Sequence, residues 1–250
     1  MQRYFINEEY EDHQLFVLSG DDFHHASHVM RMKIGDQCFL TFSNEVAIVA
    51  EITGILENQI ELKEIQKETA QKEMPYSVSI ACGYTKGDKL EWVAQKATEL
   101  GMSELIGFPS KTSVVKWDEK KLGKKNQRFE KIVKEAAEQS HRQKIPKIQL
   151  LSSFKQLETQ LKQYDHVLIA YEESAKIGET KSLVKSLQMI VPGEKILIIF
   201  GPEGGITPEE ISLFESYQGV LCGLGPRILR AETAPLYALS AMSYQWELLN

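Results

Sequence analysis

The sequence lacks the patterns that mark exported, disulfide-stapled or membrane-spanning proteins. It has three cysteines (Cys38, Cys82 and Cys222), an odd number with no C-x-x-C pair, which argues against a disulfide framework and a zinc site. No run of about 18 apolar residues occurs, as a transmembrane helix would need. The opening MQRYFINEEYED carries acids where a signal peptide has its apolar run. We therefore expect a cytoplasmic protein with no membrane span and no metal.

The composition is that of an ordinary globular chain, but its charge is unevenly spread. The 250 residues are 42% hydrophobic and 26% charged, enough for one large domain or two ordinary ones. The net charge of −6 argues against a nucleic-acid partner. Residues 1–72, however, carry −7, whereas residues 111–147 carry +7. Such a basic block attracts phosphate groups, although a solvated helical face with a lysine-rich loop gives the same count.

Two regions with different periodicity follow one another. Residues 14–65 contain short runs rich in β-branched and aromatic residues, which predict strands, and DDFHHASHVMRMKIGD between them predicts a short helix and a turn. The polar stretch 68–75 ends in proline and predicts a linker. We therefore expect a domain over residues 1–72 and a second over 73–250.

The second region alternates strands with helices. Apolar runs predict buried parallel strands at 78–84, 166–171, 195–200 and 220–225. Apolar residues recur at helical spacing after Asp88 and predict a helix that ends at Gly101. Asn126 is a candidate N-cap for the next helix. The pattern predicts an α/β sheet covered on both faces.

The most specific feature is IIFGPEGGITPEEI (198–211). A buried strand runs into a loop with three glycines, and Thr207 with Glu210 forms a capping box that opens a helix. Glycines at the carboxyl end of a strand let the backbone approach a ligand, although a plain turn uses the same residues. No G-K-[ST] follows, so this is not a P-loop. A second glycine cluster, Gly223–Ile228, begins like a dinucleotide fingerprint but lacks its third glycine.

Together these loops resemble a known family. FGPEGGITPEEI and LGPRILRAETAPLYALSAM are similar to the C-terminal motifs of SPOUT-class, S-adenosylmethionine-dependent RNA methyltransferases. Three further stretches narrow the resemblance to the ribosomal RNA small subunit methyltransferase E family. They are RYF with HVMRMKIGD, then KGDKLEWVAQKATELG, then KIVKEAAEQSHRQKIP. The resemblance covers nearly the whole chain.

The resemblance implies a fold and an activity. The C-terminal region would be an α/β domain with a deep trefoil knot, and residues 1–72 a small PUA-like β-barrel that binds RNA. The family methylates N3 of a uridine in 16S rRNA near the decoding centre. Its substrate is the assembled 30S subunit, and it works as a homodimer whose sites draw residues from both protomers.

The resemblance also implies residues for the cofactor S-adenosylmethionine. Carried over by motif, they lie on two glycine loops and a third edge: Ile199, Phe200, Gly201, Gly204 and Gly205; Leu224, Gly225, Ile228 and Leu229; and Ala170 with Tyr171. Ile199 and Ile228 fit a plain core role equally well.

The chemistry of the acceptor suggests candidate catalytic residues. Uracil N3 must lose a proton, and negative charge then builds on O2 and O4, which a nearby cation would stabilise. Arg230 is the leading candidate for that cation. Glu203 and Glu232 are candidate bases, although Glu232 equally suits a helix N-terminus. The sequence does not choose between them.

Candidate RNA contacts are the side chains that suit phosphate groups at motif positions. These are Arg3, Arg31, Lys86, Lys89, Gln139, Arg142 and Arg227. The acidic balance of residues 1–72 implies a narrow contact strip there, or binding led by the second region. His24, His25 and His28 lack the companions of a metal site.

Three other functions remain open from the sequence. The first is an α/β nucleotide-binding enzyme that uses GPEGG for phosphates, and the second is a non-catalytic RNA-binding assembly factor. The third keeps the methyltransferase fold but acts on another RNA position, and only the full-length resemblance favours uridine N3 over it.

Overall fold

The chain divides into two compact units. The computed structural model describes residues 1–12, 15–172 and 181–249. One unit is Met1–Glu73 with Ala137–Lys144, and the other is Met74–Ala136 with Ile145–Asn250. The sequence pattern predicted one boundary between residues 72 and 73 and gave no sign that 137–144 joins the first unit. That segment is held there because Gln143 N–H donates to Glu73 Oε1 at 2.8 Å and the Arg142 guanidinium pairs with the same carboxylate.

The first unit is built on a five-stranded sheet. Its strands are β1 (Gln2–Ile6), β2 (Phe16–Ser19), β3 (Gln37–Phe42), β4 (Ala47–Ile55) and β5 (Gln59–Lys67), in the order β1-β3-β4-β5-β2. β1 pairs with β3 in parallel and the other pairs are antiparallel. A short helix α1 (Gly20–His24) and a π-helical turn η1 (His25–Val29) follow β2. The sequence patterns predicted the other strands and the helix but not β1.

One apolar core fills this unit. Alternate residues of the strands point into it, as the period of two in a half-buried strand requires. Fully buried examples are Leu18, Leu40, Ile48, Ile52, Ile60 and Leu62.

The second unit is built on a six-stranded parallel sheet. Its strands are β6 (Ser77–Gly83), β7 (Glu104–Phe108), β8 (Lys147–Leu150), β9 (His166–Ala170), β10 (Lys195–Phe200) and β11 (Val220–Cys222). They lie in the order β11-β9-β10-β6-β7-β8 and every neighbouring pair is parallel. The parallel strands expected at 78–84, 166–171 and 195–200 are confirmed as buried strands. The strand expected at 220–225 is shorter, since β11 ends at Cys222, and Val220 at its start is exposed.

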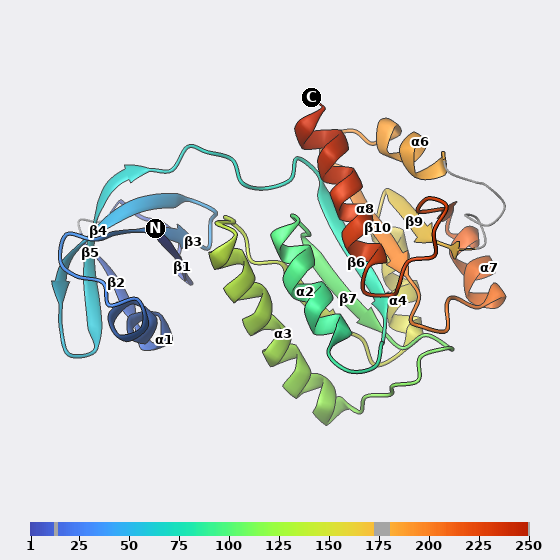
Figure 1. Ribbon diagram of the computed structural model, residues 1–250, viewed down its shortest axis with the longest axis horizontal. Coiled ribbons are helices and arrows are strands. Elements are labelled where there is room, and N and C mark those ends of the chain that lie inside the picture. The colour runs from blue at the N-terminus through green and yellow to red at the C-terminus, as the bar shows by residue number, and fades with distance from the viewer. Residues whose placement is uncertain (13–14, 173–180, 250) are drawn as a thin grey trace. The chain divides into compact units, whose positions relative to one another are not determined.

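Helices cover both faces of this sheet (Figure 1). They are α2 (Lys89–Glu99), α3 (Glu119–Gln139), α4 (Phe154–Gln160), α6 (Ser182–Met189), α7 (Pro208–Ser216) and α8 (Ala234–Ser243), with short turns η2 (Leu161–Gln163) and η3 (Tyr244–Leu248). Along β10, Ile198 and Phe200 join the core that contains residues of α2, α3 and α8, whereas Leu197 and Ile199 join the core beneath α4 and α7. A strand covered on both faces is apolar throughout, which explains the run KILIIF.

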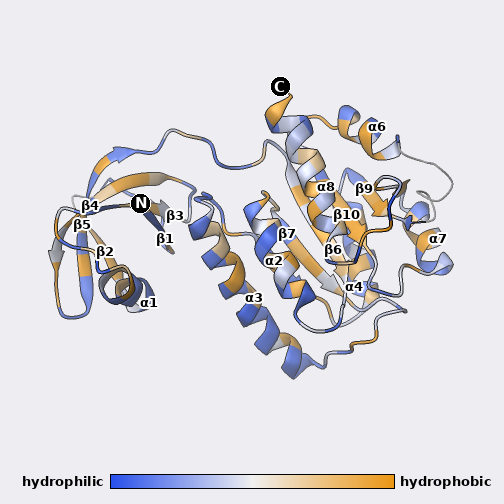
Figure 2. Cartoon of the chain, viewed as in Figure 1, coloured by the Kyte–Doolittle hydropathy of each residue, from blue (hydrophilic) through white to orange (hydrophobic). Residues whose placement is uncertain are grey.

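Helix α3 corrects one expectation from the sequence. It begins at Glu119, so Asn126 lies inside the helix, where its side-chain amide donates to Glu130 Oε1 at 2.6 Å. The Asp118 carboxylate instead accepts from Lys121 N–H at 2.8 Å at the helix start. Figure 2 shows α3 as mostly hydrophilic with interspersed hydrophobic residues. Among the described residues, no helix combines the length and hydropathy needed to cross a bilayer.

Candidate functional site

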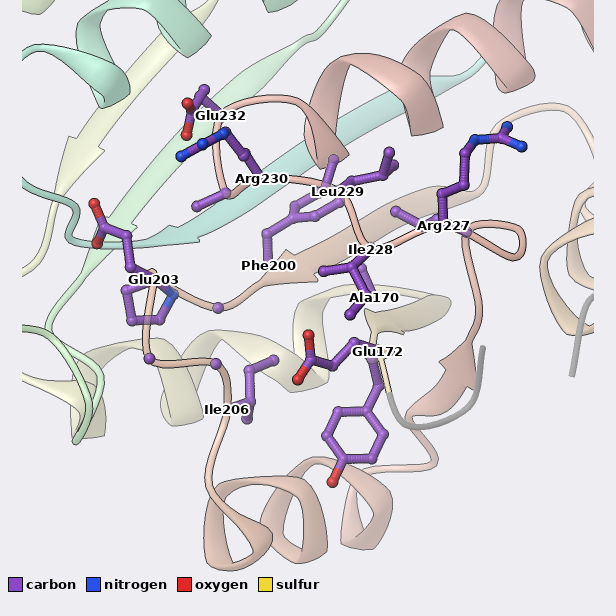
Figure 3. A pocket seen from close by; sticks show the side chains of 18 of the residues that line it. Ala170, Glu172, Phe200, Glu203, Ile206, Arg227, Ile228, Leu229, Arg230 and Glu232 are labelled. Carbon is purple, nitrogen blue, oxygen red and sulfur yellow. The ribbon is translucent and has the colours of Figure 1, made fainter. Parts of the chain in front are cut away.

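A cavity of about 500 Å³ lies where the chain leaves β9, β10 and β11. The carboxyl ends of parallel strands are the usual ligand side of such sheets. Three segments line the cavity (Figure 3). They are 170–172, 200–206 and a third containing Leu224, 226–232 and Ala234. Lys89 from the start of α2 lines the cavity too. The two glycine clusters seen in the sequence therefore meet in one site.

The first glycine loop, residues 201–207, is folded tightly on itself. Gly205 N–H donates to Pro202 O at 2.9 Å, and a Cβ on Gly201 would lie 2.8 Å from Gly205 C and 2.9 Å from Ile206 Cγ1. Gly205 has φ +73°, which disfavours other side chains. The predicted capping box of Thr207 and Glu210 is confirmed. Glycine is thus needed at these positions by the loop itself.

The second glycine loop is more open. Gly225 has φ +88°, and the nearest atom to a Cβ placed there would be Tyr237 Oη at 3.6 Å. The three residues after it are exposed, and Ile228 is 70% exposed. Gly225 is required here by its backbone conformation rather than by crowding.

Charged side chains gather at one end of the cavity. Lys89 Nζ lies 2.8 Å from Glu203 Oε1 and 3.7 Å from Glu232 Oε2. Glu203 Oε1 also accepts from Lys86 N–H at 3.3 Å. Figure 3 shows Arg230 beside Glu232, with Arg227 pointing away from them. Lys89 therefore bridges the two candidate bases beside the candidate cation.

The two glutamates differ in their surroundings. Partial burial acts to raise the pKa of Glu203, but hydrogen bonds from Lys89 and from backbone N–H groups outweigh it, so the pKa is lowered. The bond to Glu203 likewise raises the pKa of Lys89. Glu232 Oε2 is buried and accepts no hydrogen bond from the described residues. Glu203 is thus a fixed carboxylate, while Glu232 Oε2 is held only by its longer ion pair with Lys89 Nζ at 3.7 Å.

Nearly all the residues expected at the cofactor line the cavity. Ala170, Tyr171, Phe200, Gly201, Gly204, Gly205, Leu224, Ile228 and Leu229 do so, as do Arg230, Glu203 and Glu232. Ile199 does not: it is fully buried in the core beneath α4 and α7, because it faces the opposite side of β10 from Phe200. Gly225 also lies outside the lining, while Glu172 and Ile206 line it without having been expected. Glu172 follows the carboxyl end of β9, which was the available signal in the sequence.

Two of the expected RNA contacts are buried in the structure. The Arg3 side chain is 0% exposed, and its guanidinium bonds Thr41 Oγ1 and Glu68 Oε2, each at 2.6 Å. The Arg142 side chain is buried and pairs with Glu73. Both guanidinium groups hold the first unit together, and a buried group that is already paired does not reach a phosphate.

The other expected contacts remain accessible. Arg31, Lys86, Gln139 and Arg227 are exposed, and Lys89 is partly exposed in its ion pair with Glu203. Lys120, Lys121 and Lys124 of the basic block are exposed along α3. Lys125 is different, because it pairs with Glu91 and lies over the Trp117 ring.

Comparison with protein families identifies the class. Residues 72–243 match the model of an RNA methyltransferase domain, and residues 18–65 match that of an RNA methyltransferase PUA domain. The fold and the cavity thus define an α/β RNA methyltransferase of the SPOUT class with a PUA-like half-barrel at its N-terminus.

Individual relatives narrow the class to a family. Ribosomal RNA small subunit methyltransferase E of Bacillus subtilis is 45% identical over 253 residues, covering 100% of this chain and 99% of the relative. The protein of the same name from Mesomycoplasma hyopneumoniae is 31% identical over 96% of this chain and 98% of its own. The chain belongs to the ribosomal RNA small subunit methyltransferase E family, and the expected resemblance is confirmed.

Solved structures share the fold over the whole chain. A crystal structure described as a hypothetical protein is 42% identical and superposes with a TM-score of 0.92 over 100% of both chains. A structure described as a methyltransferase from Legionella pneumophila, in complex with S-adenosylmethionine, is 28% identical. It has a TM-score of 0.82 over 97% of both chains.

Proposed function

We propose that this protein methylates N3 of a uridine in 16S rRNA, near the decoding centre of the assembled 30S subunit, with S-adenosylmethionine as donor. The observation that carries the proposal is the cavity in which both family glycine loops meet beside Arg230, Glu203 and Glu232. Membership of the family supports the rRNA substrate, and the donor in the Legionella relative supports the cofactor.

The cavity fits S-adenosylmethionine in size and chemistry. Its volume of about 500 Å³ is typical of small-molecule sites. Phe200, Leu224 and Leu229 offer apolar surface for the adenine, and the glycine loops offer backbone donors and acceptors. Glu172 lines the same cavity as a carboxylate suited to hydroxyl or ammonium groups. The bound cofactor supplies a methyl group on a positively charged sulfonium.

The protein's own part in the reaction is to position the uridine and to manage its charge. Arg230 is exposed at the cavity wall, where its guanidinium can face the uracil oxygens on which negative charge builds. Of the two candidate bases, Glu232 contacts Lys89 only at 3.7 Å and accepts no hydrogen bond on Oε2 from the described residues, whereas the hydrogen bond from Lys89 and the lowered pKa make Glu203 a poorer proton acceptor. We therefore assign proton acceptance to Glu232 and the fixing of Lys89 to Glu203.

Binding of rRNA uses the exposed basic residues. On the second unit these are the lysines of α3 with Lys86 and Arg227, and on the first unit Arg31 with Gln139. Arg3 and Arg142 take no part, since both are buried in ion pairs. Guanidinium and ammonium groups on phosphates set the register of the RNA without reading its sequence.

The protein acts as a homodimer. The C-terminal helix supports this, because Tyr237, Tyr244 and Leu248 are large side chains that stay exposed on α8 and η3, and Leu249 after them is exposed too. Several large apolar side chains exposed along one terminal segment favour an interaction site there. Light scattering at micromolar concentration is expected to give twice the 28.5 kDa chain mass. A monomer mass would contradict the dimer but not the chemistry.

The decisive experiment maps methylated nucleosides in small-subunit rRNA from cells with and without the protein, followed by restoration with purified protein and 30S subunits. We expect one N3-methyluridine to disappear and to return. If the methyl group that disappears is on another base or on a 2′-hydroxyl, the protein is a methyltransferase of the same fold that acts on a different RNA position. Unchanged methylation with defective subunits would indicate a non-catalytic assembly factor.

A further inference from the structure

A segment between β7 and α3, residues 109–113, contacts the glycine loop from outside the cavity. Thr112 Oγ1 donates to Gly205 O at 2.6 Å. A Cβ on Gly204 would lie 2.8 Å from Thr112 Cβ and 3.3 Å from Thr112 O. Two successive residues of the loop therefore touch the same threonine, and the missing Cβ of Gly204 makes room for that threonine.

A buried carboxylate ties the same segment to the far end of the loop. Glu210 is 2% exposed. Its Oε1 accepts from Lys111 N–H at 2.9 Å, and its Oε2 accepts from Thr207 N–H at 2.9 Å and from Ser110 Oγ at 3.3 Å. A carboxylate this deeply buried is stable only when its oxygens are hydrogen-bonded, as they are here.

We propose that Thr112 and Glu210 are positioning residues that hold the 201–207 loop in the conformation that binds S-adenosylmethionine. The inference rests on the proposed function, because it takes this loop as part of the cofactor site. Among the described residues neither side chain lines the cavity, whereas Gly201, Gly204 and Gly205 do. Both residues therefore act through the loop: a loop ordered before binding loses less conformational entropy when the ligand arrives.

The test compares three variants by calorimetric titration with S-adenosylmethionine. Thr112→Val removes the hydroxyl and keeps the shape, Thr112→Ser keeps the hydroxyl, and Thr98→Val is the matched control. Like Thr112, Thr98 does not line the cavity, but its Oγ1 is fully buried and donates to Ala94 O within α2 at 2.7 Å, whereas Thr112 donates to the glycine loop. We expect Thr112→Val to bind about 3- to 10-fold more weakly, the range that one net hydrogen bond corresponds to. Thr112→Ser should bind like the parent, and Thr98→Val should lose thermal stability but no affinity.

Amide hydrogen exchange of the ligand-free protein separates this inference from the proposed function. Gly205 N–H and Thr207 N–H are both bonded in the loop, so Thr112→Val should speed exchange in peptides covering 201–207, and Thr98→Val should not. Unchanged exchange in these peptides would overturn the positioning role of Thr112. So would a Thr112→Ser variant that binds S-adenosylmethionine as weakly as Thr112→Val. A parent protein that fails to bind S-adenosylmethionine would contradict the proposed function, and the exchange result would still decide whether Thr112 orders the loop.

Discussion

The two units use the same side chain, arginine, in opposite ways. In the first unit Arg3 and Arg142 are buried and paired with glutamates, so their charge holds strands and loops together. In the second unit Arg227 and Arg230 are exposed at the cavity. All four stand in motifs of the family. A motif arginine can therefore contact a ligand only where the fold leaves its guanidinium uncovered.

The sheets differ in a way that explains where the site is. The first unit has a mainly antiparallel sheet, whose hairpin turns lie at both ends. The second has a purely parallel sheet, so every strand ends at the same edge and the loops after β9, β10 and β11 converge. A parallel sheet brings the loops that carry functional side chains to one edge, and the cavity lies at that edge.

The largest effect is expected from Arg3→Ala in the first unit. Removing the guanidinium leaves Glu68, whose side chain is 7% exposed, without its charged partner. Breaking one side of a buried ion pair costs about 3–5 kcal/mol. Urea unfolding should show this decrease in stability, whereas Arg31→Ala, at an exposed arginine, should stay within about 0.5 kcal/mol of the parent. If Arg3→Ala were as stable as the parent but no longer bound RNA, Arg3 would be an RNA contact and not a structural arginine.

Arg230→Ala should abolish most turnover while leaving cofactor affinity unchanged. An electrostatic interaction that strengthens only in the transition state contributes roughly 100- to 1000-fold in rate. The measurement is single-turnover methylation of purified small subunits at saturating donor, with donor binding titrated separately. Raising the pH should help the variant more than the parent, because hydroxide then assists removal of the N3 proton.

Arg227→Ala is the matched control for that experiment, since Arg227 lines the same cavity but points away from Arg230 and Glu232 (Figure 3). We expect it to weaken rRNA binding more than the chemical step. Parental turnover in Arg230→Ala together with a large decrease in Arg227→Ala would transfer the catalytic role to Arg227.

Gly201→Ala should weaken S-adenosylmethionine binding by more than tenfold, or about 1.4 kcal/mol. The added Cβ would meet Gly205 C at 2.8 Å, so the loop must open to accept it. Gly123→Ala is a suitable comparison because a Cβ there, on α3, meets no atom within 4 Å. Calorimetry should show parental affinity for Gly123→Ala. Equal affinity in both variants would remove the first glycine loop from the binding site.

The smallest effect concerns the basic face of α3. Replacing Lys120, Lys121 and Lys124 with Gln should flatten the salt dependence of rRNA binding, by about 0.7 to 0.9 in log–log slope for each phosphate group that these lysines neutralise in the parent. Lys125 is left unchanged because it is paired with Glu91. A second triple variant, at the exposed Lys162, Lys185 and Lys195, removes the same charge elsewhere on the second unit. Identical slopes in the two triple variants would mean that α3 presents only a solvated surface.

Local patterns were sufficient to predict much of the second unit. The apolar runs at 166–171 and 195–200 predicted parallel strands because a strand covered on both faces needs apolar residues throughout. Thr207 and Glu210 predicted the start of α7 because a capping box is a contact between residues only three apart. The expectation that Asn126 caps a helix was wrong because asparagine, although common at helix starts, also occurs inside helices. α3 begins earlier in the chain, where the Asp118 carboxylate accepts a hydrogen bond from Lys121 N–H.

Long-range contacts decided the rest. β1 was missed because a strand of five residues is defined by its pairing with β3, more than 30 positions away. The placement of 137–144 in the first unit depends on Glu73, some 70 residues earlier. The role of Thr112 was missed because the glycine loop that it contacts lies some 90 positions later in the chain.

The sequence alone determined the two regions, the α/β character of the second, the two glycine loops and the family to which the chain belongs. These follow from periodicity, turn chemistry and contiguous motifs, all of which are local. Only the tertiary structure decided which charged motif residues are exposed and therefore able to contact a ligand. It buried Arg3 and Arg142, turned Ile199 away from the cavity, tied Glu203 to Lys89 and left an oxygen of Glu232 without a hydrogen bond among the described residues. The physical reason is that burial and pairing depend on which distant segments pack together, and a side chain's chemistry is set by those neighbours.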